Sequence, residues 1–126
     1  MHRSKLVGFI IDCQTQNLPA AAQFWADALG MGIKRLPGAE GDTYMQLVDP
    51  TDRLNIEVQT VTHPSRVHLD IETDDIEAEV RRLETLGATR VAQVHTWWVM
   101  EAPTGHRFCV VRNSSSDFRD RAREWR

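Results

Sequence analysis

Two apolar stretches, residues 7–12 and 67–72, are rich in β-branched residues and predict strands. A helical pattern follows each stretch, and three more strand-like stretches follow each helical pattern. These later strands are expected near 33–36, 43–48 and 54–59 in the first half, and near 89–92, 96–101 and 107–111 in the second. Each half of the chain therefore predicts the order strand, helix, strand, strand, strand.

The two predicted helices begin and end with matching signals. In the first helix, Asn17 is the expected N-cap, Pro19 lies in the opening turn, and Gly30 ends the helix. The second helix runs from Asp74, the expected N-cap, to Gly87. A leucine precedes the final glycine in both helices, and a Pro-Thr turn recurs at 50–51 and 103–104, so the halves are interpreted as a repeat.

The repeat predicts an α+β fold made of two tandem βαβββ modules in a single domain. The boundaries expected are about 6–60 for module 1, about 66–112 for module 2, and 113–126 for a charged C-terminal tail of the 126-residue chain. In the tail, Phe118, Ala122 and Trp125 fall at i, i+4 and i+7, which predicts a helix with one apolar side. This tail either docks on the body or on a second subunit, or frays.

Composition narrows the classes of partner. A net charge of -3 and a pI near 5.9 give no general attraction to nucleic acids or anionic membranes. The longest apolar runs, such as Leu6 to Ile11, are far shorter than the roughly 20 residues of a membrane span. The N-terminus lacks the pattern of a signal peptide, so a cytoplasmic location with Cys13 and Cys109 as free thiols is expected.

The order of elements resembles that of the vicinal oxygen chelate superfamily, which includes glyoxalase I, methylmalonyl-CoA epimerase, extradiol dioxygenases, and fosfomycin and bleomycin resistance proteins. The resemblance covers residues 6–112 and is strongest to the small glyoxalase-like subgroup. It implies a cup-shaped mixed sheet, a small-molecule ligand in the cup between the modules, and a homodimer. The pieces that carry it are Phe24-Trp25 before Leu29-Gly30, Val67-His68-Leu69-Asp70, and the turn and strand at 102–109.

The resemblance places the superfamily's four metal-ligand positions at Gly8, Glu57, His68 and Cys109. Glu57 and His68 suit divalent zinc, iron, manganese or nickel. Glycine has no side chain, however, and a cysteine stands where the usual carboxylate would be. The metal site is therefore incomplete, and classical glyoxalase I activity, which the full ligand set supports, is disfavoured.

Strand alternation predicts which side chains face the cup. His68 and Asp70 share one face of their strand, as Asn55, Glu57 and Gln59 do on theirs. His68 is either a metal ligand, a general base or a histidine held by Asp70 or Glu57 without catalysis. Cys109 is a thiolate ligand, a nucleophile or a small buried residue. His68, Glu57 and Cys109 are the catalytic candidates, and the ligand-binding candidates are Asn55, Gln59, Asp70, Tyr44 and Trp97, with Trp98 and Met100 assigned to the core.

The sequence favours a glyoxalase-like protein that binds a small molecule, with catalysis left open. One alternative is a divalent-metal-dependent lyase, isomerase or dioxygenase. A second is a metal-free protein that sequesters a toxin or an antibiotic. A third is a regulatory subunit that makes contact through its C-terminal tail.

Overall fold

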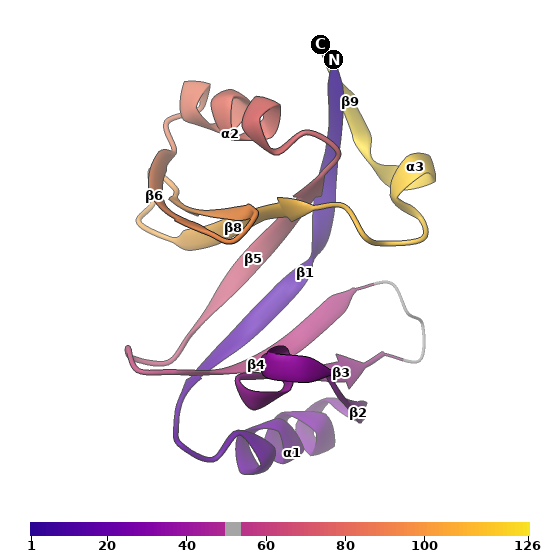
Figure 1. Ribbon diagram of the computed structural model, residues 1–126, viewed down its shortest axis with the longest axis vertical. Coiled ribbons are helices and arrows are strands. Elements are labelled where there is room, and N and C mark those ends of the chain that lie inside the picture. The colour runs from indigo at the N-terminus through magenta and orange to yellow at the C-terminus, as the bar shows by residue number, and fades with distance from the viewer. Residues whose placement is uncertain (50–53) are drawn as a thin grey trace. The chain divides into compact units, whose positions relative to one another are not determined.

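The computed structural model describes residues 1–49 and 54–126, which form two compact units (Figure 1). Unit 1 consists of residues 1–7 and 68–126, and unit 2 of residues 8–67. The first half of the chain contains β1 (His2–Gln14), α1 (Leu18–Leu29), β2 (Gly32–Arg35), a short 3-10 helix (Gly38–Asp42), β3 (Tyr44–Val48) and β4 (Asn55–Val61). The second half contains β5 (Arg66–Thr73), α2 (Ile76–Thr85), β6 (Thr89–Val94), β7 (Trp97–Glu101), β8 (Arg107–Arg112), α3 (Phe118–Arg121) and β9 (Arg123–Trp125).

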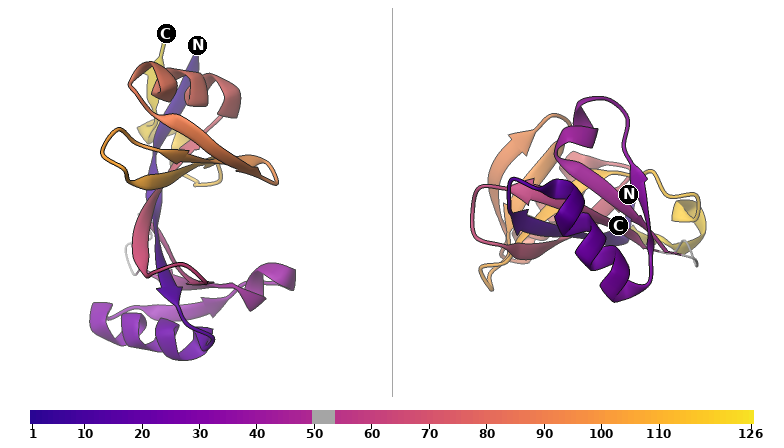
Figure 2. Two further views of the ribbon diagram at one scale, coloured as in Figure 1. Left: turned by 90° about the vertical axis from the view of Figure 1, so that its left-hand side faces the viewer. Right: turned by 90° about the horizontal axis from the view of Figure 1, so that it is seen from below.

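Unit 2 is built on strands in the order β2-β3-β4-β1, with β1 parallel to β4 and the other pairs antiparallel. Helix α1 lies along one side of these strands (Figure 2). Its buried residues Ala22 and Ala26 pack with Leu47, Ile56 and Val58 to form the core of this unit. The helix covers one face of the strands and leaves the other face free to carry polar side chains.

Gly8 shows why β1 and β4 approach so closely in unit 2. Its strand partner is Asn55. A Cβ atom added to Gly8 would lie 1.8 Å from the backbone oxygen of Asn55, a distance at which no side chain fits. The glycine at this position is therefore required by the packing of the strand pair, and no metal-binding side chain can replace it without moving β4.

Unit 1 has strands in the order β5-β8-β7-β6, with β5 parallel to β8 and the other two pairs antiparallel. Helix α2 packs against β8, β7 and β6 through Val80 and Leu83, which join Met100, Phe108 and Val110 in the core. The N-terminal residues of β1 pair with the short C-terminal strand β9, and the two chain ends lie side by side (Figure 1).

The predicted α+β fold and the order of elements within both modules are confirmed. The nine strands among the described residues include parallel and antiparallel pairs. Asn17 caps α1 by accepting a hydrogen bond from the backbone of Ala20, and Gly30 ends the helix with a φ of 69°. The Pro-Thr turn predicted at 50–51 lies outside the described residues. Within the described part of the chain, none of the helices is long and apolar enough to cross a membrane.

Two predictions at the ends of helices are wrong. Asp75, not Asp74, caps α2, because its side chain accepts a hydrogen bond from the backbone of Ala78. Asp74 instead accepts a hydrogen bond from the backbone of Arg3 at 2.8 Å, which ties it to β1. In the tail, the helix ends at Arg121 rather than continuing to Trp125, because the chain then pairs with β1 as strand β9.

Candidate functional site

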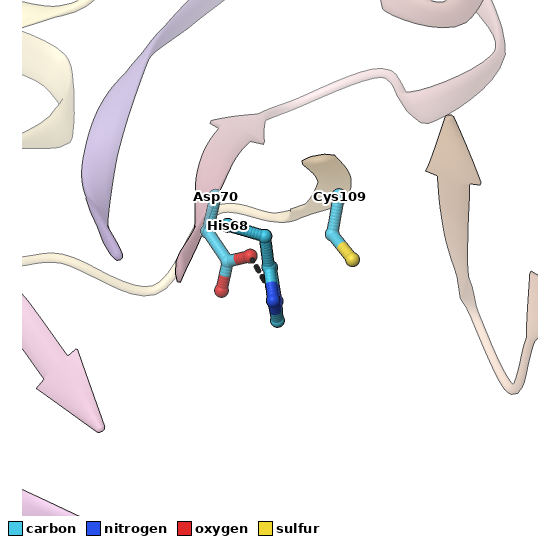
Figure 3. Close-up of side chains that lie close together, drawn as sticks. All are labelled: His68, Asp70 and Cys109. Atoms are coloured by element: carbon cyan, nitrogen blue, oxygen red, sulfur yellow. Dashed lines mark ion pairs between the residues drawn. The ribbon is translucent and has the colours of Figure 1, made fainter. Parts of the chain in front are cut away.

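Three side chains that bind metals in proteins lie together in unit 1 (Figure 3). His68 and Asp70 come from β5, and Cys109 comes from β8. One nitrogen, one oxygen and one sulfur atom from these residues all lie within 4.8 Å of one another. Asp70 is directly opposite Cys109 in the strand pair, and His68 is two residues before Asp70, so strand alternation places all three on one face.

The three donor groups are largely shielded from water. The side chains of His68 and Asp70 are 13% and 14% exposed, and Cys109 is buried at 9%. His68 Nε2 lies 3.5 Å from Asp70 Oδ1. This distance is longer than the roughly 2.7–3.2 Å of an ordinary N–H···O hydrogen bond, so these two atoms lie close together without closing onto each other.

The separation of the His68 and Asp70 atoms suits a bound metal ion. Zinc holds nitrogen and oxygen ligands at about 2.0–2.2 Å in a tetrahedral arrangement, which separates two such ligands by about 3.4 Å. The 3.5 Å between the His68 and Asp70 atoms matches that separation. A thiolate together with an imidazole favours zinc over hard cations such as magnesium, and three protein ligands leave one position of a tetrahedral ion for another molecule. The donor set therefore fits the divalent metal that the sequence suggested.

Glu72 faces the same side of β5 as Asp70 but has a structural role. Its fully buried carboxylate accepts hydrogen bonds from the backbone of Ser114 and from the backbone and hydroxyl of Ser115, and Lys5 Nζ lies 3.3 Å away. Burial acts to raise the pKa of Glu72, but these donors outweigh it and hold the pKa below its usual value. Glu72, as a paired carboxylate, thereby anchors the segment after β8 to strand β5.

The polar face of unit 2 carries four of the predicted site residues. Gln46 donates a hydrogen bond to Asn55 at 2.8 Å, and Asn55 donates one to the Glu57 carboxylate at 2.6 Å. Gln59 donates a hydrogen bond to the Tyr44 hydroxyl at 2.8 Å. These side chains are half-buried and hydrogen-bonded to one another, so they form a preorganised polar surface on β3 and β4.

The predicted site residues thus fall into two groups. Asn55, Glu57, Gln59 and Tyr44 belong to unit 2, and His68, Asp70, Cys109 and Trp97 belong to unit 1. The pairing of Glu57 with His68 as metal ligands stays a prediction. Sequence reasoning named Asp70 only as a ligand-binding residue and missed it as a metal-binding candidate. The signal was present in the His-x-Asp spacing, which puts both side chains on one face of a strand.

The aromatic pair on β7 divides as predicted. Trp98 packs against the core that contains Met100. Trp97 points to the opposite face, which is the face of Cys109, because Val99 lies directly opposite Cys109 and Trp97 is two residues from Val99. The role of Trp97 as a wall for a ligand stays a prediction.

The fold, with two βαβββ modules, is that of the glyoxalase, bleomycin resistance and dioxygenase proteins. A family model described as the glyoxalase-like domain matches residues 8–111, most of the chain, and the chain belongs to this family. The predicted membership of the vicinal oxygen chelate superfamily is therefore confirmed. A search of curated protein sequences found no significant match.

Solved structures show the same fold at low sequence identity. Methylmalonyl-CoA epimerase from Mycobacterium tuberculosis is 16% identical with a TM-score of 0.58, covering 87% of this chain and 90% of that chain. An NAD-dependent benzaldehyde dehydrogenase from Legionella pneumophila is 12% identical with a TM-score of 0.58, and the match covers 84% of this chain and 99% of that chain. A glyoxalase/bleomycin resistance protein/dioxygenase superfamily member from Vibrio splendidus 12B01 is 15% identical with a TM-score of 0.50, and the match covers 90% of this chain and 100% of that chain. These likenesses establish the fold alone.

Proposed function

We propose that this protein binds a small molecule through a divalent metal ion, zinc by preference, held by His68, Asp70 and Cys109. The observation that carries the proposal is the grouping of three chemically different donor atoms within 4.8 Å on one face of unit 1. Groupings of exposed acidic residues are common on protein surfaces. This one combines an imidazole, a carboxylate and a thiol, and all three are mostly shielded from water.

Each residue contributes a different property to the proposed site. Cys109 supplies a soft thiolate donor, which favours zinc over manganese or magnesium. Asp70 supplies a negative charge beside His68, and its carboxylate and the Cys109 thiolate together offset the charge of a divalent ion. A zinc ion held by three protein ligands has a position for an oxygen of the bound molecule and polarises that oxygen as a Lewis acid.

Elemental analysis of purified protein tests the proposal directly. Protein prepared without chelator or metal-affinity resin and then equilibrated with zinc is expected to retain about one zinc ion per chain. The variants His68→Ala, Asp70→Asn and Cys109→Ser are each expected to bind zinc at least about a hundredfold more weakly, because loss of an outer-shell partner alone costs roughly ten- to a hundredfold.

His63→Ala is the matched control. His63 is a half-buried histidine in unit 2 whose ring nitrogen contacts the backbone oxygen of Pro64, so its removal should leave zinc binding unchanged. Circular dichroism of every variant establishes that the fold persists. Zinc binding that is equally strong in the folded wild-type protein and in the folded His68→Ala and Cys109→Ser variants would refute the proposed site.

A further inference from the structure

An apolar surface adjoins the three donor groups on the same face of unit 1. Val99 on β7 lies directly opposite Cys109, and Ala92 on β6 lies opposite Val99. Further along the same two strands, Trp97 and Val94 are also paired. Directly opposite residues project from the same side of a sheet, so the surface runs from the donor groups through Val99 to Trp97.

The distance along this surface is set by strand geometry. Neighbouring strands are about 4.8 Å apart, and two residues along a strand cover about 6.7 Å, which places the Cα of Trp97 about 8 Å from that of Cys109. Trp97 and Cys109 therefore project from neighbouring positions on one face of the sheet. Val94 is 37% exposed and Trp97 is half-buried, so the apolar end of the surface is accessible.

The turn that joins β6 to β7 holds Trp97 in place. His95 in this turn has a φ of 52°, the only positive φ of a non-glycine residue in the part of the chain that the structure describes. A positive φ is uncommon outside glycine, and histidine is one of the few other residues that adopt it readily. The His95 ring lies 5.3 Å from the Trp97 ring at an angle of 53°, a contact that supports one side of the indole.

We propose that the ligand of this site is an aromatic compound that bears an oxygen-donor group. The donor group would bind at His68, Asp70 and Cys109, and the ring would lie over Val99 against Trp97. His95 acts as a positioning residue for the Trp97 indole. This inference rests on the metal-dependent binding proposed above and specifies the chemical class of its ligand.

Two hydroxamic acids separate the two claims. Acetohydroxamic and benzohydroxamic acid carry the same zinc-binding group but differ in a methyl against a phenyl substituent. Calorimetric titration of the zinc-loaded protein with each compound gives the ratio of the two dissociation constants. Comparing this ratio between wild type and Trp97→Ala removes the intrinsic difference between the compounds, and the preference for the phenyl compound is expected to fall about five- to tenfold in the variant.

Further variants separate the contact from the stability of the fold. Trp97→Phe should keep most of the preference for the phenyl compound, and Phe24→Ala, which removes an exposed aromatic side chain of unit 2, should keep all of it. His95→Gly accepts the positive φ of the turn and removes the supporting ring, so the preference should fall without loss of stability.

The possible failures are distinct. Zinc binding with the same ratio of dissociation constants in wild type and Trp97→Ala would overturn the aromatic ligand class and leave the metal site standing. An unchanged ratio in His95→Gly, with a reduced ratio in Trp97→Ala, would overturn the positioning role of His95. Absence of zinc binding would overturn the proposed function and this inference together.

Discussion

The carboxylate of Glu79, on α2, is fully buried and depends on Arg82 for its stability. Arg82 donates two hydrogen bonds to it, Nε to Oε1 and Nη2 to Oε2, both at 2.8 Å, and His2 Nε2 lies 2.7 Å from Oε1. Replacing Arg82 by leucine would leave the buried charge with His2 as its main partner. We expect a loss of about 2–4 kcal/mol in the free energy of unfolding, because removing one partner of a buried ion pair costs roughly 3–5 kcal/mol and Arg82 is 23% exposed.

Urea unfolding at pH 7, followed by circular dichroism, measures this loss as a decrease of about 1–2 M in the midpoint. Arg81→Leu is the matched control, because Arg81 is 73% exposed and its contact with Glu77 is 3.7 Å long. Its removal should cost about 0–0.5 kcal/mol. The double variant Arg82→Leu/Glu79→Gln should recover part of the loss, since no buried charge remains. A single Arg82→Leu variant as stable as Arg81→Leu would refute the reasoning.

The same cluster predicts a dependence on pH. Burial acts to raise the pKa of Glu79, but hydrogen bonds from Arg82, His2 and Ser4 outweigh it and lower the pKa. A carboxyl group with a lowered pKa in the folded state stabilises the fold above its unfolded pKa of about 4.3, and this contribution is lost as the pH falls through the folded pKa. The difference in stability between wild type and Arg82→Leu should therefore shrink below about pH 4.

Three further predictions concern other parts of the chain. Gly8→Ala should destabilise the protein by several kcal/mol or prevent folding, because its Cβ would lie 1.8 Å from the Asn55 backbone oxygen; an unchanged melting temperature would contradict this. The free energy of unfolding of the wild-type protein, measured by urea titration, should decrease from about pH 5 to about pH 3, because Glu72 and Glu79 have lowered pKa values in the folded state. A free energy of unfolding that stays constant over this range would argue against this prediction. Deleting residues 113–126 should lower the urea midpoint, because Glu72 loses its backbone donors; an unaltered midpoint would show that the tail is dispensable.

Local sequence signals predicted the order of elements because each acts over a few residues. Asn17 and Gly30 illustrate this, since a cap needs only its own helix. Asp74 and Asp75 are both acceptable caps, and the choice between them depends on the contact of Asp74 with Arg3, 71 residues away. The end of the tail helix likewise depends on pairing with β1, which no local pattern encodes.

The candidate site was predictable to the extent that strand alternation decides it. Alternation placed His68 and Asp70 on one face, and the resemblance drew attention to Cys109. Neither strand alternation nor the resemblance showed that the neighbouring strand brings Cys109 opposite Asp70, because strand register is set by long-range pairing. The close contact at Gly8 could not be predicted either, because a glycine in the sequence does not reveal how closely the backbone of Asn55 approaches it.

Cobalt(II) titration tests the central claim most directly, because cobalt replaces zinc in protein sites and reports a thiolate ligand through its absorption. Wild-type protein is expected to show a thiolate-to-cobalt charge-transfer band in the near ultraviolet that saturates at about one equivalent and disappears when zinc is added. Cys109→Ser should lack the band, whereas Cys13→Ser should retain it. A band that persists in Cys109→Ser, or its absence from the folded wild-type protein, would contradict a metal site at His68, Asp70 and Cys109.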